Sequence, residues 1–337
     1  MKKIAVIILN WNGLHLLKEF LPEAVEFTVS DEADLFVADN GSTDGSLEWV
    51  KNNYPLVKTI TFSENLGFAE GYNRAINETG YPFTVLLNSD VEVTENWLVP
   101  MIRFMEANPH VAALQPKIKS YRDKTSFEYA GAAGGYLDKL GYPYCRGRLF
   151  DIVEKDLKQY DGGPHEICWA SGAALMVRTD LYIKAGGLDP LFFAHMEEID
   201  LCCRLIGLGY KIYMTPNSEV FHLGGATLNQ GNPQKTYLNF RNNLLLLHKN
   251  LPEKIGRRKL ILRRLFDSLA FFMFVLKLDF PNAKSVIKAH KDFRKMKRNY
   301  RQFPNVDYLT GLPGSDIIAV FKRYLPIRNK NLPDKRL

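Results

Sequence analysis

Residues 4–13 read IAVIILNWNG, an apolar run that ends abruptly in two asparagines, a tryptophan and a glycine. The run is too short for a secretory signal and has no small-residue cleavage site after it, so we expect a buried first β-strand in a protein that stays in the cytoplasm. Open parallel sheets bind their ligands beyond the carboxyl ends of the strands. The asparagines of this stretch therefore stand where a ligand site is expected.

Outward from this stretch, short apolar runs alternate with helix-like segments, which is typical of βαβ units. Further strands are predicted at residues 35–38, 57–62, 83–87, 173–177 and 211–214. Helices are predicted at 14–25, 46–53, 68–79, 97–108 and 197–207. We therefore expect an α/β fold, Rossmann-like, with a mostly parallel sheet and helices on both of its faces.

Charge divides the 337 residues into two regions. Residues 251–337 hold 21 Lys and Arg against 7 Asp and Glu, whereas residues 1–250 hold 23 against 30. We expect 1–250 to be one domain and 251–337 to be a basic, mainly helical extension with an anionic partner. The four cysteines form no C-x-x-C pair, so reduced thiols are expected.

Three predicted strands end in clusters of carboxamides and carboxylates. These clusters are NWNG at 10–13, DNGSTDG at 39–45 and NSDVE at 88–92. Taken alone, the second cluster is also explained as a turn and a helix cap, because it consists of turn formers. The carboxyl ends of parallel strands meet at one edge of a sheet, so together the clusters predict a site for a polar ligand there.

Phosphate binding by a glycine-rich loop is excluded. The chain has no G-x-x-x-x-G-K-[ST] motif, and no G-x-G-x-x-G follows the first strand. A diphosphate would then need a divalent cation as its counter-charge, and Mg²⁺ or Mn²⁺ prefers a few protein oxygens together with substrate phosphates. Asp90 is the candidate ligand, with Asn88 or Glu92 as additional contacts.

A second cluster of acids begins the helix predicted at 197–207. Glu197, Glu198 and Asp200 follow two phenylalanines. The helix macrodipole stabilises acids at this position, so capping is one interpretation. A carboxylate beside an apolar wall is also what a general base requires. Asp200 and Arg204 are four residues apart and are placed to form an ion pair, which would make Asp200 structural.

His222 follows a predicted strand end at 219–221. A lone histidine is more often structural than functional. A neutral imidazole is nevertheless a good ligand for Mn²⁺, so His222 is a second candidate for a metal site.

These blocks resemble the family 2 glycosyltransferases, in particular bacterial rhamnosyltransferase-like members that build surface polysaccharides. The resemblance covers about residues 3–250 and implies the A-type glycosyltransferase fold. The segments that carry it are 8–13, 39–46, 65–73, 86–90, 192–204 and 220–225.

The resemblance also implies how a nucleoside-diphosphate sugar donor is bound. Asp39 would hydrogen-bond the base, and Asn10 and Asn73 would hold the nucleoside. The other donor-binding positions that it implies are Asn12, Asn65, Gly67, Asn88, Ser89 and Asp90. Position 88 carries Asn where the family's D-x-D metal motif has its first Asp.

Catalytic roles follow from the same resemblance. Asp90 and His222 would hold Mn²⁺ or Mg²⁺ on the diphosphate. Glu198, which stands where the family more commonly has Asp, would be the base, with Glu197 as the second candidate. The base would deprotonate a hydroxyl of a glycan or lipid-linked glycan acceptor as it attacks the donor sugar, with inversion.

The basic extension contains an apolar stretch at 265–280 that is interrupted by Asp267, Lys277 and Asp279. It is short for a membrane span of about 20 residues, so we expect a helical hairpin in the membrane interface. A soluble helical pair is the alternative. No nucleic-acid-binding module is recognisable. The expected location is the cytoplasmic face of the inner membrane, in peripheral contact with anionic lipid.

Two other functions fit a polar site of this kind. A sugar nucleotidyltransferase would need a glycine-rich basic loop near the N-terminus, which residues 10–13 do not supply. A catalytically inactive nucleotide- or carbohydrate-binding protein would not need Asp90, Glu198 and His222 together. The sequence does not indicate the oligomeric state.

Overall fold

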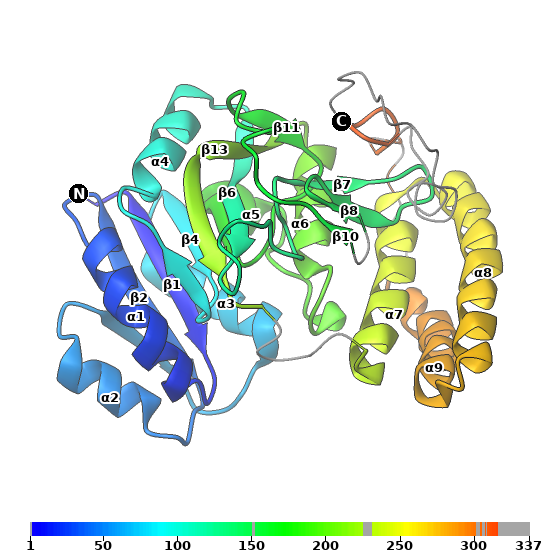
Figure 1. Ribbon diagram of the computed structural model, residues 1–337, viewed down its shortest axis with the longest axis horizontal. Helices are drawn as coiled ribbons and strands as arrows, with labels where there is room; N and C mark the ends of the chain where they lie inside the picture. Colours follow the sequence, from blue (N-terminus) through cyan, green and yellow to red (C-terminus); the bar gives the residue numbers. More distant parts are fainter. Residues whose placement is uncertain are drawn as a thin grey trace. The chain divides into compact units, whose positions relative to one another are not determined.

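The computed structural model describes residues 2–149, 152–224, 231–300, 304, 307 and 309–315 (Figure 1). The chain divides into two compact units. The first comprises Met1–Gly135 and Cys145–Gly224, and the second comprises Tyr136–Tyr144 and Gly225–Leu337.

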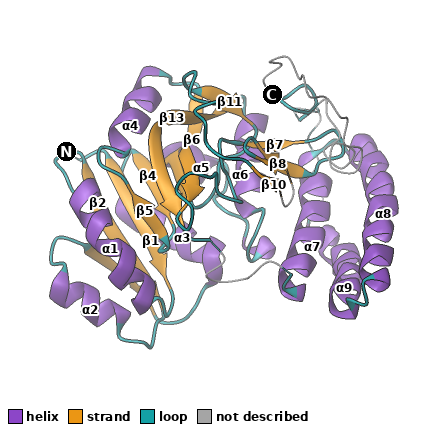
Figure 2. Ribbon diagram, in the orientation of Figure 1, coloured by secondary structure: helices purple, strands orange, loops and turns teal. Residues whose placement is uncertain are grey.

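A mixed sheet forms the centre of the first unit (Figure 2). Its described strands are β1 (Ile4–Asn10), β2 (Ala33–Asn40), β3 (Lys58–Phe62), β4 (Phe83–Leu87), β5 (Val91–Val93), β6 (Val111–Ser120), β11 (His165–Ile167), β12 (Ala174–Arg178) and β13 (Lys211–His222). Their order is β11-β13-β6-β12-β4-β1-β2-β3, and β5 pairs with β13. Strands β4, β1, β2 and β3 run parallel, whereas β12 runs antiparallel to both β4 and β6. The predicted α/β class is confirmed, whereas strands β5, β6 and β11 of this sheet were not predicted.

Helices cover both faces of this sheet, as expected. They are α1 (Leu14–Thr28), α2 (Ser46–Asn53), α3 (Gly67–Thr79), α4 (Leu98–Ala107), α5 (Thr179–Lys184) and α6 (Glu197–Gly207). Alternate residues of β1 face opposite ways: Ile4 and Val6 share a buried core with Leu17 of α1, while Leu9 faces α3. A Cβ at Gly71 of α3 would lie 2.9 Å from the terminal methyl groups of Leu9, so a larger residue at position 71 would require the Leu9 side chain to shift.

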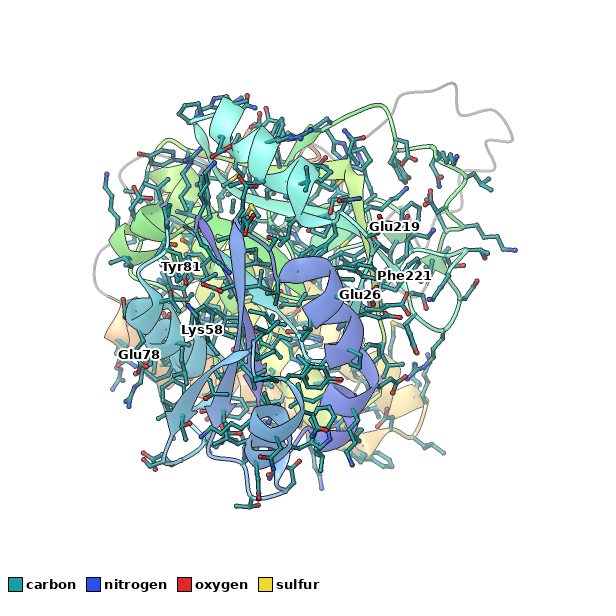
Figure 3. All side chains as sticks on the ribbon, turned by 90° about the vertical axis from the view of Figure 1, so that its left-hand side faces the viewer. Glu26, Lys58, Glu78, Tyr81, Glu219 and Phe221 are labelled. Carbon is teal, nitrogen blue, oxygen red and sulfur yellow. The ribbon has the colours of Figure 1, made fainter. Side chains whose placement is uncertain are left out.

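Asp34, near the start of β2, contacts side chains from three other segments of the chain. Its carboxylate pairs with the ammonium groups of Lys2 and Lys58, each at 2.8 Å, and accepts a hydrogen bond from Tyr81. Figure 3 shows Lys58 and Tyr81 close together. Burial opposes ionisation of Asp34, yet these three partners lower its pKa to about 2. The charged cluster thus stabilises the end of the sheet opposite to the polar strand ends.

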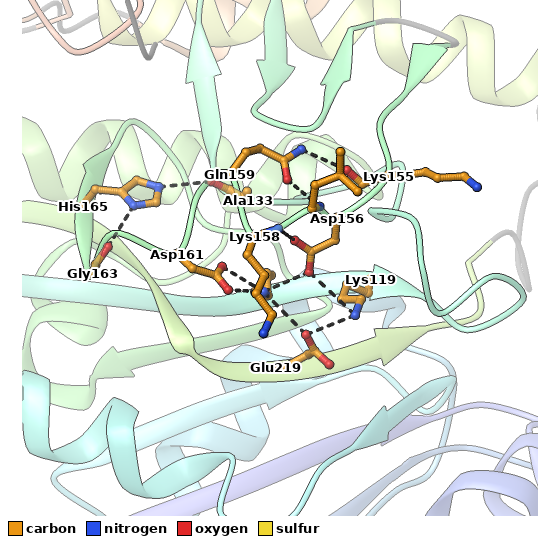
Figure 4. A network of polar contacts seen from close by, with 12 residues as sticks. Lys119, Ala133, Lys155, Asp156, Lys158, Gln159, Asp161, Gly163, His165 and Glu219 are labelled. Carbon is orange, nitrogen blue, oxygen red and sulfur yellow. Dashed lines mark hydrogen bonds and ion pairs between the residues drawn. The ribbon is translucent and has the colours of Figure 1, made fainter. Parts of the chain in front are cut away.

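The segment between β6 and β12 forms a small antiparallel sheet and a loop. The strands are β7 (Gly135–Leu137), β8 (Pro143–Cys145), β9 (Arg148–Leu149) and β10 (Ile152–Val153), in the order β10-β9-β8-β7. Lys117 of β6 is buried and pairs with Asp156 and Asp161 of the loop, both at 2.9 Å. Lys119 pairs with Glu219 of β13 at 3.3 Å (Figure 4). These ion pairs hold the loop on the two strands.

The second unit consists of a hairpin and three long helices, α7 (Pro233–Asn250), α8 (Glu253–Leu276) and α9 (Phe280–Met296). Its interior contains a polar network in which Asp267 contacts Arg263 at 3.3 Å and His290 at 2.9 Å. The Arg263 guanidinium stacks 3.5 Å from the centroid of the Tyr142 ring. No helix among the described residues is long and apolar enough to cross a membrane.

The compact units divide the chain at a different place from the boundary predicted at residue 250. Helix α7 packs against α8 and α9, so the helical unit includes residues that precede 250. The four consecutive leucines at 244–247 are all buried, and this apolar run explains why α7 requires helical partners.

Candidate active site

The ends of β1 and β2 are joined by Asn10. Its amide nitrogen donates to Asp39 Oδ1 at 3.3 Å, to Ser42 Oγ at 3.2 Å and to Ser46 Oγ at 2.8 Å. Its amide oxygen is buried and has no hydrogen-bond partner. A buried acceptor without a partner is costly, so this oxygen is an unsatisfied polar atom at the end of β1.

The loops after β1 and β2 form one hydrogen-bonded layer. Asn12 Oδ1 accepts from the backbone N–H of Thr43 at 2.8 Å, and the Asn12 N–H donates to Ser42 Oγ at 2.9 Å. Asp44 accepts from the Leu14 N–H at 2.9 Å and the Ser46 N–H at 3.0 Å. Asp44 therefore stabilises a turn, as one interpretation of residues 39–45 predicts. The same turn holds the polar side chains at this edge of the sheet.

Asn40, a member of the polar cluster predicted at 39–45, connects this layer to the start of α3. Its amide nitrogen donates to Asn65 Oδ1 at 3.0 Å and to the Gly67 carbonyl at 3.1 Å. Its amide oxygen accepts from the Leu66 N–H at 2.9 Å. Asn65 and Gly67, both predicted to bind the donor, thus lie beside the end of β2.

Asn73 is engaged by protein partners. Its oxygen accepts from the Tyr182 hydroxyl at 2.6 Å and from the Leu188 N–H at 2.9 Å, and its nitrogen donates to the Leu188 carbonyl at 2.8 Å. These bonds use the amide oxygen and one amide hydrogen. The geometry therefore favours a role for Asn73 in holding the segment before α6 rather than in holding the nucleoside.

Asp90 and His222 meet because β5 pairs with the end of β13, which sets His222 opposite Val91. His222 Nε2 lies 3.2 Å from Asp90 Oδ1. On its other side, His222 Nδ1 lies 3.6 Å from Glu128 Oε2. All three side chains are buried. The sequence analysis missed Glu128, which lies in a stretch without clear periodicity.

The two carboxylates determine the charge of His222. Burial alone would lower the pKa of His222, but the contacts with Asp90 and Glu128 outweigh it and raise that pKa to about 10. Burial likewise opposes ionisation of Asp90 and Glu128, and contact with His222 lowers the pKa of both. Without a metal, the group is an imidazolium between two carboxylates.

Asp90 and His222 also fit a divalent cation. No cluster of three His, Cys, Asp or Glu side chains suited to a metal occurs in the described part of the chain. Mn²⁺ and Mg²⁺ at phosphate sites need few protein ligands, because substrate phosphates and water complete the shell. One carboxylate and one imidazole on the same edge meet that requirement. Glu92 is engaged elsewhere, since it pairs with Lys124 at 2.5 Å.

The start of α6 is brought to the end of β4 through β12. The half-buried Asn88 and Ser89 follow β4, and the Asn88 N–H donates to the Ala173 carbonyl at 3.0 Å. A Cβ at the neighbouring Gly172 would lie 3.8 Å from Glu198 Cβ. Glu198, which lies more than a hundred positions after Asp90 in the sequence, is thereby placed close to the turn that carries Asp90.

Glu197 is buried and Glu198 is half-buried at the start of α6. In each, Oε2 is inaccessible and has no hydrogen-bond partner. Burial raises the pKa of Glu198 to about 7 and that of Glu197 well above its usual range, with repulsion from Glu198 adding to the latter. Asp200 pairs with Arg204 at 2.8 Å, which confirms the structural interpretation of that acid.

The loop that leads into α6 has an unusual backbone. Phe193, His195 and Met196 have φ values of 67°, 66° and 74°, in the left-handed region that side chains other than glycine rarely adopt. Such strain is concentrated at functional segments, where it fixes a required geometry. Here it fixes the entry to the helix that begins with the two glutamates.

The model of the family described as "Glycosyl transferase family 2" matches residues 5–176, half of the chain. That match spans the ends of β1, β2 and β4 and stops before α6 and His222. Gly225, which ends the block at 220–225 that resembles the family, lies outside the described residues.

Among curated proteins, the chain is 27% identical over 237 residues to the N-acetylglucosaminyl-diphospho-decaprenol L-rhamnosyltransferase of Mycobacterium tuberculosis strain H37Rv. The match covers 65% of this chain and 75% of that enzyme.

Two solved structures share the fold. One is GalNAc-T7 with UDP, GalNAc and Mn²⁺, with a TM-score of 0.56 and 16% identity over 74% of this chain and 48% of that one. The other is the mannosyltransferase PcManGT from Pyrobaculum calidifontis with GDP-Man and Mn²⁺, with a TM-score of 0.54 and 13% identity over 87% of both chains. The predicted A-type glycosyltransferase fold is confirmed. The chain belongs to glycosyl transferase family 2.

Proposed function

We propose that the protein is an inverting, metal-dependent glycosyltransferase that transfers a sugar from a nucleoside-diphosphate donor to a hydroxyl of a glycan or lipid-linked glycan, in surface polysaccharide synthesis. The meeting of Asp90 with His222 at the strand ends, beside the polar layer of β1 and β2, carries the proposal. The rhamnosyltransferase relative is named for a diphospho-decaprenol acceptor, which supports the lipid-linked class.

In this proposal, Asp39 and Asn10 bind the donor nucleoside. Asp39 already accepts from Asn10 and from the Ser42 N–H at 3.2 Å, and a carboxylate has about four lone-pair positions, so it retains capacity for a base. Asp90 and His222 would hold the Mn²⁺ or Mg²⁺ that accompanies the diphosphate. The chemistry that such an ion supplies is neutralisation of the negative charge on the departing diphosphate.

Glu198 is the proposed base, with Glu197 as the second candidate. Its carboxylate takes the proton from the acceptor hydroxyl while the hydroxyl oxygen bonds to C1 of the sugar. The bond from C1 to the phosphate oxygen breaks on the opposite face, so the configuration inverts in one displacement. The raised pKa of Glu198 makes its carboxylate a stronger base than an exposed glutamate.

Peripheral attachment to the cytoplasmic face of the inner membrane is part of the same proposal. A lipid-linked acceptor lies at that surface, and residues 251–337 carry 21 basic side chains against 7 acidic ones.

Two substitutions test the site. Asp90→Ala is expected to abolish the stabilisation that Mn²⁺ adds to donor binding, measured as the thermal shift produced by UDP-, GDP- and dTDP-sugars with and without Mn²⁺. Glu198→Gln is expected to retain that shift and to lose sugar transfer, measured by nucleotide release with the lipid-linked acceptor. Full transfer by Glu198→Gln would exclude it as the base. A wild-type protein that binds donor but never transfers would be an inactive binding protein.

A further inference from the structure

Helix α8 exposes large apolar side chains of the kind that a helix on the surface of a globular protein buries. Its exposed side carries seven large apolar side chains that are each between 39% and 83% exposed. These residues, which we call the α8 stripe, are Ile261, Leu262, Leu265, Leu269, Phe272, Met273 and Leu276.

The α8 stripe is continuous along one face. Leu262, Leu265, Leu269, Phe272 and Leu276 follow one another at alternating spacings of three and four residues. With 3.6 residues per turn, all seven residues fall within an arc of about 120°. The stripe extends over four turns of α8, and beyond it Leu278 and Phe280 of the turn to α9 are also exposed.

The opposite side of α8, which packs within the helical unit, combines the buried apolar residues Gly256 and Leu260 with a buried ion pair. Arg263 and Asp267 are 2% and 1% exposed and belong to the network that includes His290. A helix that is stabilised in water places leucines inside and charges outside. In α8 the ion pair and Leu260 lie inside, whereas the seven residues of the α8 stripe lie outside, an arrangement suited to an apolar medium on the outer side.

The charges around the α8 stripe are positive. Lys254 and Arg258 lie in line with it at its N-terminal end, Arg264 lies along its edge, and Lys277 lies at its C-terminal end; all four are exposed. The two acids of α8 are Glu253, which pairs with Arg257 at 2.5 Å, and the buried Asp267. On α9, Lys284, Lys288, Lys291 and Lys295 line a shallow groove together with Ile287 and with Asp292, which pairs with Lys288 at 3.1 Å, so four cations face one acid there.

We propose that the α8 stripe docks into an anionic phospholipid surface. Its leucine and phenylalanine side chains enter the boundary between headgroups and acyl chains, while the surrounding Lys and Arg side chains contact lipid phosphates. This deepens the proposed function by naming the surface that would hold the enzyme where its lipid-linked acceptor lies. A second copy of the chain would cover the leucines but would bring two sets of these cations together, so charge complementarity favours lipid.

Co-sedimentation of the full chain with vesicles tests the inference. Wild type is expected to bind vesicles of phosphatidylcholine mixed with phosphatidylglycerol, and to bind pure phosphatidylcholine more weakly. The double variant Leu269→Glu with Phe272→Glu is expected to lose at least about tenfold in partitioning, because carboxylates do not enter the acyl boundary. The matched control is Leu56→Glu with Leu157→Glu, which changes two exposed apolar residues of the first unit and is expected to bind as wild type.

Circular dichroism and thermal melting verify that all variants are folded. Equal partitioning of the stripe variant and wild type would overturn the proposal. So would light scattering that shows a wild-type dimer converted to monomer by the stripe variant, together with no vesicle binding by wild type. Donor binding measured in solution with UDP and Mn²⁺ involves no lipid, so a failure of the proposed function is observed separately.

Discussion

Glu198 combines catalytic potential with a cost in stability. Its pKa of about 7 means that the carboxylate is protonated as pH falls through 7, so transfer is expected to rise with pH up to about 7 and then level. Glu198→Gln should lower the rate by about 10²- to 10⁴-fold at the plateau. Rate measurements at saturating donor across pH 5–9 test this, and a rate independent of pH would assign the base elsewhere.

Ionisation of Glu198, which is expected to raise the rate of transfer, is expected to lower the stability of the fold. Because the pKa is raised in the folded state, stability is fully present below the ordinary carboxyl range and is lost as pH rises through about 7. Glu198→Gln should therefore raise the Tm above pH 7 and change it little near pH 5. An equal Tm change at both pH values would show that burial of the ionised carboxylate is not the cause.

Glu128 is expected to tune the metal site through His222. A carboxylate behind a metal-bound histidine orients the ring, and its loss typically weakens metal binding by about 10- to 100-fold. We expect Glu128→Gln to weaken Mn²⁺ binding by this amount in calorimetric titrations with UDP present. Glu92→Gln is the matched control, because Glu92 pairs with Lys124 and should leave the affinity unchanged.

The site residues that could be predicted from the sequence are those that the topology of the sheet brings together. Asn10, Asp39 and Asp90 were identified because each follows an apolar strand, and parallel strands bring such residues together. Asn73 belonged to a recognised block, but its hydrogen bonds to Leu188 depend on a loop whose path local sequence does not specify. Glu128 has no local pattern, since it reaches His222 only through the fold.

Among the elements, β6 shows why sequence patterns fail in a mixed sheet. Its centre contains Gln115, Pro116 and Lys117, which interrupt the apolar pattern of a buried strand. The structure satisfies them from distant segments: Gln115 Oε1 accepts from the Ser171 N–H at 2.9 Å, and Lys117 pairs with Asp156. Strand β13 was predicted to end at residue 214 for the same reason, although it continues to His222.

The ion pairs of Lys117 are expected to be important for stability. Lys117→Ala leaves the buried carboxylate of Asp156 without its nearest cation, and breaking a buried pair typically costs about 3–5 kcal/mol. Urea unfolding of this variant tests the expectation. Lys211→Ala removes a more exposed pair with Glu166 and should cost less than about 1 kcal/mol. Similar losses in both variants would contradict a special role for the buried network.

For the whole molecule, the asymmetry of charge and the α8 stripe lead to one expectation. Salt screens lysine–phosphate attraction but leaves apolar insertion intact. Raising NaCl from low to high concentration should therefore weaken vesicle binding without abolishing it, measured by co-sedimentation. Complete release at high salt would show that the cations act alone. Both the helical character and the basic charge of this region were predictable, whereas the direction of the leucines depends on how α7 to α9 pack.

The position of β13 in the sheet has a consequence for biosynthesis. This strand lies between β11 and β6, and its last residue supplies the imidazole that meets Asp90. A nascent chain that has not yet released residue 222 from the ribosome presents β6 as an open edge, which invites pairing with other chains. The pairing of β13 with β6 is therefore a late step of folding that covers the open edge and also completes the proposed metal site. A chain whose synthesis is incomplete lacks the full site.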